Sequence, residues 1–266
     1  MVSFVGHVLP VLATIAVWFL ATGLIAWAAN APRETYGRSL LWAGVVAAGG
    51  MLCVIASARM TGVGGAYLGF TGAMAIWGWH ELAFLTGGVT GSRREPCPPD
   101  ARGFTRFAKA SAAVLHHEIA LAATLAILVV LCWGQPNPVG AQVFALLFGL
   151  RLIAKLNLFA GVPNASTDIL PRHLAYLTSY FGPNRFTALL ALSIAGTLLL
   201  AGWLGALAAG MAAPGASVAA SLLFAMAALG ALEHLFFALP MRDGALWGWA
   251  IAARDKRAHT NAMRGL

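Results

Sequence analysis

The chain has 266 residues, of which 60% are hydrophobic and only 10% are charged, against about 25% charged residues in a typical soluble domain. This composition excludes an ordinary soluble globular protein and indicates a membrane protein. The net charge of +8 could suggest a nucleic-acid partner, but the 17 basic residues lie in short connections between apolar stretches, as in membrane proteins, so we expect no nucleic acid.

Seven apolar stretches have about the 20 residues that a helix needs to cross a bilayer. In chain order, they cover residues 5–29, 39–58, 65–87, 107–133, 140–160, 187–208 and 216–239. The first stretch has no basic residue before it and no small-residue cleavage site after it, so we interpret it as a span and not as a signal peptide. The sequence predicts an all-α polytopic membrane protein, with residues 1–240 as the transmembrane bundle.

Basic residues gather in alternate connections. The first, third and fifth connections and the tail contain Arg33, Arg38, Arg93, Arg94, Arg102, Arg106, Lys109, Arg172, Arg185, Arg242, Arg254, Lys256, Arg257 and Arg264. The other connections contain only Arg59. The positive-inside rule therefore predicts that the N-terminus lies outside and the C-terminus in the cytoplasm.

Three segments outside the spans have a distinct character. Residues 88–106 form a polar loop broken by prolines, which we expect to be mobile. Residues 170–181 place three rings at helical spacing, which predicts a short interfacial helix with its rings at headgroup level: His173, Tyr176 and Tyr180. Residues 241–266 are predicted to be a cytoplasmic interfacial tail, anchored by Trp247 and Trp249.

Ionisable side chains interrupt four of the predicted spans. They are His80 with Glu81, His116 with His117 and Glu118, Arg151 with Lys155, and Glu233 with His234. A charge at a helix centre costs roughly 2.5–3.5 kcal/mol on insertion scales, so such residues usually have a function. At the rise of an α-helix, all four groups fall in the cytoplasmic half, within a slab on the order of 10 Å thick. We therefore expect them to converge.

Small residues indicate which face of a span packs against other helices. Gly65, Gly69 and Ala73 form such a stripe, and His80 lies on the same face, eleven residues after Gly69. His234 follows Gly230 by four residues and so shares its face as well. The triplet 116–118 covers about 200° of a helical arc, so at least one of its members must point inward.

Three interpretations of these groups remain open. Imidazole and carboxylate could hold iron or another transition metal, although the Glu-x-x-His spacing of helical di-iron proteins is absent; the candidate ligands are His80, Glu81, His116, His117, Glu118, Glu233 and His234. Alternatively, inward histidines could be axial ligands of a tetrapyrrole. In the third interpretation, the carboxylates Glu81, Glu118 and Glu233 pair with Arg151 and Lys155 and only fix helix packing.

At these same residues the chain resembles a known family. The stretches that carry the resemblance are WGWHELAFLTG (77–87), HHEIALAATLA (116–126), LRLIAKLNLFAGVPN (150–164), PRHLAYLTSYFG (171–182) and EHLFFALPMRDGALWGW (233–249). They are similar to the photosynthetic complex assembly proteins of the PuhE type, which are associated with the bacteriochlorophyll-based reaction centres of purple bacteria. The resemblance implies a cellular process and carries no ligand or catalytic residue with it.

The resemblance and the charged groups together support the following hypothesis for the function. The protein would be a photosynthetic (reaction-centre or antenna) complex assembly factor of the bacterial inner membrane, with its N-terminus periplasmic. It would bind bacteriochlorophyll or a precursor in a pocket in the cytoplasmic half of the membrane. His80, His117 and His234 would be the ligands, Glu81, Glu118 and Glu233 would orient them, and Arg151 and Lys155 would balance charge or hold an acidic substituent.

The expected partners are the lipid bilayer and either subunits of the photosynthetic complexes or pigment-synthesis proteins. The alternative hypothesis is a membrane-embedded, metal-dependent oxidoreductase acting on a tetrapyrrole or another lipid-soluble substrate. Whether the protein is an enzyme is left open by the sequence.

Overall fold

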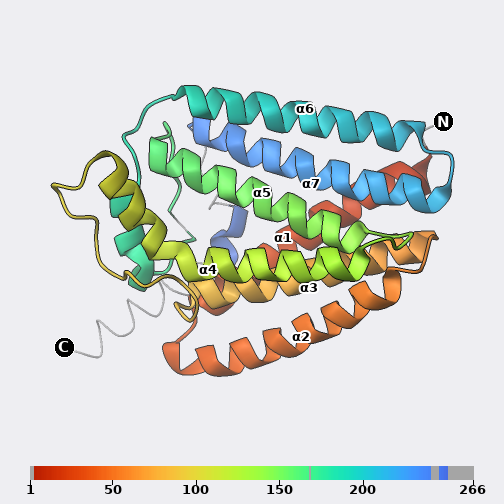
Figure 1. Cartoon of the computed structure of the whole chain (residues 1–266), viewed down its shortest axis with the longest axis horizontal. Coiled ribbons are helices and arrows are strands. Elements are labelled where there is room, and N and C mark those ends of the chain that lie inside the picture. Colours follow the sequence, from red (N-terminus) through yellow and green to blue (C-terminus); the bar gives the residue numbers. More distant parts are fainter. Residues whose placement is uncertain (1–2, 168, 241–245, 251–266) are drawn as a thin grey trace.

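The computed structural model describes residues 3–167, 169–240 and 246–250, and within them it is an all-α bundle without strands (Figure 1). The long helices are α1 (Leu9–Ala29), α2 (Tyr36–Ser57), α3 (Val63–Leu85), α4 (Gly103–Cys132), α5 (Val139–Ala160), α6 (Ala188–Gly210) and α7 (Pro214–Ala238). Shorter helices are η1 (Phe4–Val8), η2 (Arg33–Thr35) and η3 (Arg172–Tyr180). The predicted fold class is confirmed.

Six of these helices are long and apolar enough to cross a membrane, with η1 continuing into α1 and η2 into α2. The remaining long helix, α3, has 23 residues, or roughly 35 Å at the rise of an α-helix, so its length also suffices. Glycines and the pair His80–Glu81 make α3 less apolar than the others. Each predicted span overlaps one long helix, and the largest boundary difference is four residues, at the starts of α1 and α4.

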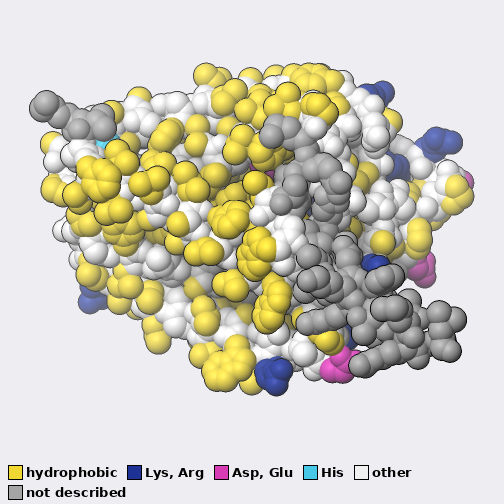
Figure 2. All heavy atoms as spheres, turned by 180° about the vertical axis from the view of Figure 1, so that it is seen from behind, with side chains coloured by type: hydrophobic (Ala, Val, Ile, Leu, Met, Phe, Trp, Pro, Cys, Tyr) yellow, Lys and Arg dark blue, Asp and Glu magenta, His cyan; other side chains and the backbone are white. Residues whose placement is uncertain are grey.

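The bundle is built around α3, which packs against α1, α2, α5 and α7, while α6 covers α7 (Figure 1). The main core lies between α3, α4, α5 and α7 and contains Phe70, Trp77, Leu121, Phe144 and Leu222. Large apolar side chains also cover the outside, as Figure 2 shows for one face, and Val130 and Leu199 are examples. In water these side chains would be costly, so this exterior fits contact with lipid.

Helices α2 and α3 approach most closely where two glycines face each other. A Cβ atom at Gly72 would lie 2.6 Å from the carbonyl oxygen of Gly50, and one at Gly50 would lie 2.7 Å from that of Gly72. Neither position has room for a side chain. The small residues therefore set the distance between the two helices, as in many membrane bundles.

Most of the charge lies at one end of the molecule, which we call the basic end. There α1, α3, α5 and α7 finish and α2, α4 and α6 begin, and η3 and the segment 88–102 fold over them (Figure 1). Apart from Arg59, the described basic residues of the connections belong to this end.

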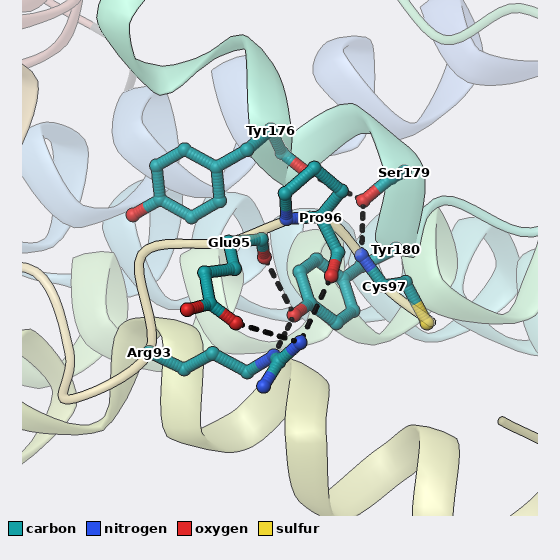
Figure 3. Close-up of polar contacts among 7 residues, drawn as sticks. All are labelled: Arg93, Glu95, Pro96, Cys97, Tyr176, Ser179 and Tyr180. Atoms are coloured by element: carbon teal, nitrogen blue, oxygen red, sulfur yellow. Dashed lines mark hydrogen bonds and ion pairs between the residues drawn. The ribbon is translucent and has the colours of Figure 1, made fainter. Parts of the chain in front are cut away.

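Residues 88–106 were expected to form a mobile loop, but α4 already begins at Gly103, and the segment 88–102 is docked on η3 (Figure 3). Arg93 Nε donates to the hydroxyl of Tyr180 at 2.7 Å, and that hydroxyl donates to the carbonyl oxygen of Glu95 at 2.9 Å. The N–H of Cys97 donates to Ser179 Oγ at 2.7 Å. Tyr180 is consequently buried within the protein and not exposed as an interfacial anchor would be, although the predicted short helix is present.

Trp247 also differs from the expectation of an interfacial anchor. It is 3% exposed and packs on α1, where its Nε1 donates to the carbonyl oxygen of Phe19 at 3.0 Å. Trp249, at 52% exposed, is the more open of the two rings. The rest of the predicted tail, residues 241–245 and 251–266, lies outside the described residues, so a separate tail domain stays a prediction.

Candidate functional site: a charged cluster across four helices

Arg151, on α5, connects α3 and α7 through ion pairs. Its guanidinium lies 2.8 Å from Glu233 Oε1 on α7 and 3.7 Å from Glu81 Oε2 on α3. The Arg151 side chain is 39% exposed, and the carboxylates are less so. A buried or lipid-facing cation normally requires such partners. One side chain thus binds three helices together.

Lys155 lies one turn further along α5 and makes the second ionic link. Its ammonium group bonds to Glu118 Oε1 on α4 and lies 5.7 Å from the centre of the Phe84 ring. The predicted convergence of the four groups is therefore confirmed for their charged members. The pairing of carboxylates with Arg151 and Lys155 is confirmed as well. Because both cations have carboxylate partners, the geometry favours charge balance over holding an acidic substituent.

The cluster contains one more carboxylate than cations. Glu81 shows where the excess lies, because its Oε1 is buried and has no hydrogen-bond partner among the described residues. An oxygen in that position can accept a hydrogen bond from a ligand or a water molecule. Glu81 is therefore the member of the cluster with unused bonding capacity.

His80 and His117 point into the bundle from α3 and α4. His80 Nε2 lies 3.0 Å from Thr124 Oγ1. His117 is 1% exposed, and its ring lies tilted against that of Phe84 with 4.7 Å between the ring centres. Neither of its ring nitrogens has a partner in the described part of the chain. The sequence analysis missed Thr124, although its position seven residues after His117 places it on the same face of α4.

His234, on α7, is 0% exposed and has an asymmetric environment. Its Nδ1 donates to the carbonyl oxygen of Gly230 at 2.7 Å, which places the lone pair of the neutral ring on Nε2. Within the described residues, Nε2 has no partner. The inward orientation predicted for His80 and His234 is confirmed.

His116 does not belong to this interior. It lies on an exposed side of α4, apart from the buried histidines, and its role as a ligand stays a prediction. The sequence left open which of residues 116–118 would point inward. In the structure, the packing of α4 turns His117 toward the interior. In the described residues, moreover, no three side chains of His, Cys, Asp or Glu are grouped closely enough to hold a metal ion.

The sequence analysis also missed Thr90, which follows α3 and connects the cluster to the basic end. The Thr90 carbonyl accepts a hydrogen bond from the backbone N–H of His117 at 2.9 Å. Its side chain, 1% exposed, points toward a cavity at the basic end. A threonine in a glycine-rich turn carries no recognisable signal, so only the fold could reveal it.

Comparison with known proteins assigns the chain to a family. The family described as "Protein of unknown function (DUF3623)" matches residues 4–258. A relative from Rhodobacter capsulatus, the "Uncharacterized 30.4 kDa protein in puhA 5'region", is 38% identical over 258 residues, which are 96% of this chain and 94% of the relative. No solved structure matches. The match along nearly the whole length shows that the chain belongs to the DUF3623 family.

Proposed function

We propose that this protein is a membrane-embedded factor for the assembly of photosynthetic complexes and that it holds bacteriochlorophyll or a precursor through His234. Two findings support the process: the resemblance to the PuhE type, and a 38% identical relative whose name refers to the puhA region. The observation that supports pigment binding is the imidazole of His234, which is buried and held through Nδ1, while its Nε2 has no partner among the described residues.

His234 has the donor chemistry that an axial ligand requires. Ligating histidines usually donate one ring N–H to a carbonyl or carboxylate, which fixes the tautomer and orients the other nitrogen. His234 has this arrangement, whereas the Nε2 of His80 is engaged by Thr124 and the ring of His117 is anchored by no hydrogen bond within the described residues. When bound, the magnesium of the pigment would supply the Lewis acid for Nε2.

The ionic cluster would support this ligand by fixing the helices around it. Glu233 precedes His234 directly and is held by Arg151, so the rotation of α7 at this position is tied to α5. The imidazole is completely buried and its ring lies 5.9 Å from that of Phe237. Access for a large ring therefore requires that side chains such as Phe237 move aside.

The alternative, a metal-dependent oxidoreductase, stays a prediction. No observation on the described residues favours it, because the candidate ligands are distributed over ion pairs and separate hydrogen bonds.

Purification from cells that make bacteriochlorophyll tests the proposal. The full chain is extracted in a mild detergent, and its absorption spectrum and metal content are measured together. We expect pigment at close to one molecule per chain, lost in His234→Gln and retained in His116→Gln, the exposed control. In a strain without the protein, His116→Gln should restore assembled complexes and His234→Gln should not.

Two results would contradict the proposal. A colourless protein whose His234→Gln variant still supports assembly would remove the role of His234. Stoichiometric iron or manganese without pigment would favour the oxidoreductase instead.

A further inference from the structure

A cavity of about 280 Å³ opens at the basic end, away from the charged cluster. Its walls come from η2 and the start of α2, from the end of α3 and the segment after it, and from η3. These segments are far apart in the sequence and meet only in the fold. The cavity lies where the spans end, at the height expected of lipid headgroups.

The lining of this cavity is positively charged. Arg33 reaches it from η2 and Arg94 from the segment after α3, and no Asp or Glu of the described part of the chain lines it. Both arginines are exposed in the bundle and have no carboxylate partner among the described ion pairs. Two guanidinium groups without counter-charges make a strong attraction for an anion.

Unsatisfied polar atoms gather on the same walls. Thr90 Oγ1, His173 Nε2 and the hydroxyl of Tyr176 are buried and have no hydrogen-bond partner among the residues that the structure describes. Buried polar groups nearly always have partners, so three such groups on one wall mark a place where a water molecule, an ion or a ligand would bind. Thr90 and Tyr176 can donate, as can His173 in its Nε2–H or protonated form.

We propose that this cavity binds a phosphate group. Two guanidinium groups and up to three neutral donors suit an anion with several oxygens, and basic pockets between membrane helices are known to hold anionic headgroups. The phosphate can belong to an anionic phospholipid or to a soluble phosphate compound. This inference does not rest on the proposed function, because its residues lie outside the charged cluster.

The test compares phosphate sources on the full-length protein in detergent micelles. Binding of a fluorescent phosphatidylglycerol, whose headgroup is anionic, is measured against phosphatidylcholine, whose choline cancels the charge of its phosphate. Inorganic phosphate is added as a competitor. Variants Arg33→Gln and Arg94→Gln each remove one charge, and Arg38→Gln is the matched control, an exposed arginine on α2 outside the cavity. Tyr176→Phe removes a donor and leaves the charge unchanged.

We expect phosphatidylglycerol to bind better than phosphatidylcholine, with about a fivefold loss for each cavity arginine, since one basic residue near the surface contributes ~1 kcal/mol. Tyr176→Phe should also weaken binding, and Arg38→Gln should not. Competition by inorganic phosphate without a preference between the two lipids would assign the site to a soluble phosphate. Equal binding of both lipids without any effect of phosphate would overturn the inference, as would an Arg38→Gln loss equal to that of Arg33→Gln.

Discussion

Arg151 is the residue that connects most of the charged cluster, because two carboxylates from different helices share its guanidinium. In Arg151→Gln, Glu81 and Glu233 would face each other without a cation. Breaking a buried pair from one side costs about 3–5 kcal/mol. Because the Arg151 side chain is 39% exposed, solvent screening should reduce this loss to roughly 2–3 kcal/mol. Unfolding in mixed detergent micelles measures the loss.

The triple variant Glu81→Gln, Arg151→Gln, Glu233→Gln is the control for this effect. It removes the two carboxylates together with their cation, so no uncompensated charge remains and most of the stability should return. If Arg151→Gln alone is as stable as the natural protein, the ion pairs do not hold the helices together.

His173, at the basic end, should make the stability of the folded protein depend on pH. Burial lowers the pKa of His173 below its usual value, and the nearby charge of Arg33 lowers this pKa further. Below the ordinary pKa of about 6.5, the unfolded chain takes up a proton that the folded protein does not. Stability should therefore be fully present above this pH and fall as the pH decreases through it.

The difference between the natural protein and His173→Gln isolates this contribution. Stability profiles from pH 5 to 8 should diverge on the acid side, with the variant showing the flatter curve. Tyr36 and Tyr176 also line the cavity, and burial raises the pKa of the Tyr176 hydroxyl further above this range. Identical profiles would contradict the prediction.

The sequence predicted part of this residue-scale picture. His80 and His234 could be assigned to the interior because each shares a helical face with small residues that must pack against a neighbour. The choice between His116 and His117 could not be made, since adjacent residues differ by only about 100° and the neighbouring helices set the rotation. The cavity at the basic end could not be predicted either, because no sequence spacing indicates that Arg33 and Tyr176 lie close together in the fold.

At the scale of elements, the packing of α2 on α3 depends on two facing glycines. In Gly72→Ala, the new Cβ would lie 2.6 Å from the Gly50 carbonyl oxygen, so the backbones must separate. Overpacking of this kind typically costs about 1–3 kcal/mol. Gly49→Ala is the matched control, because nothing lies within 4 Å of its Cβ, and removing a helical glycine there should gain about 0.5–1 kcal/mol.

Thermal unfolding of the two variants in the same detergent checks this prediction. A loss of stability in Gly72→Ala together with a gain in Gly49→Ala would show that the contact between α2 and α3, and not helix propensity, determines the effect at Gly72. Equal effects at both positions would contradict the close approach of α2 and α3.

The elements themselves were predictable to different degrees. The seven long helices follow from apolar length alone, which the bilayer imposes. The docking of segment 88–102 could not be foreseen, because prolines and polar residues indicate a loop without indicating what it touches. Its contacts with η3 come from the Tyr180 hydroxyl, which accepts from Arg93 and donates to the carbonyl of Glu95, and from the hydrogen bond between Cys97 and Ser179. The inward turn of Tyr180 follows from these contacts.

For the whole molecule, the uneven distribution of charge predicts orientation. The basic end contains nearly all described basic residues of the connections, and Arg59 is the exception at the opposite end. Lys and Arg in short loops are retained on the cytoplasmic side during insertion. Both the charged cluster and the phosphate cavity would then face the cytoplasm, the side on which soluble phosphate compounds and anionic leaflet lipids are abundant.

Single cysteines at the two ends test this orientation. In a background with the three native cysteines replaced by alanine, Trp133→Cys marks the end opposite the basic end, where Trp133 is 79% exposed. Arg102→Cys marks the basic end, at the exposed start of α4. A membrane-impermeant maleimide should label Trp133→Cys in spheroplasts and Arg102→Cys only after the membrane is opened. The reverse pattern would place the cavity outside, where it could reach only the outer leaflet and periplasmic solutes.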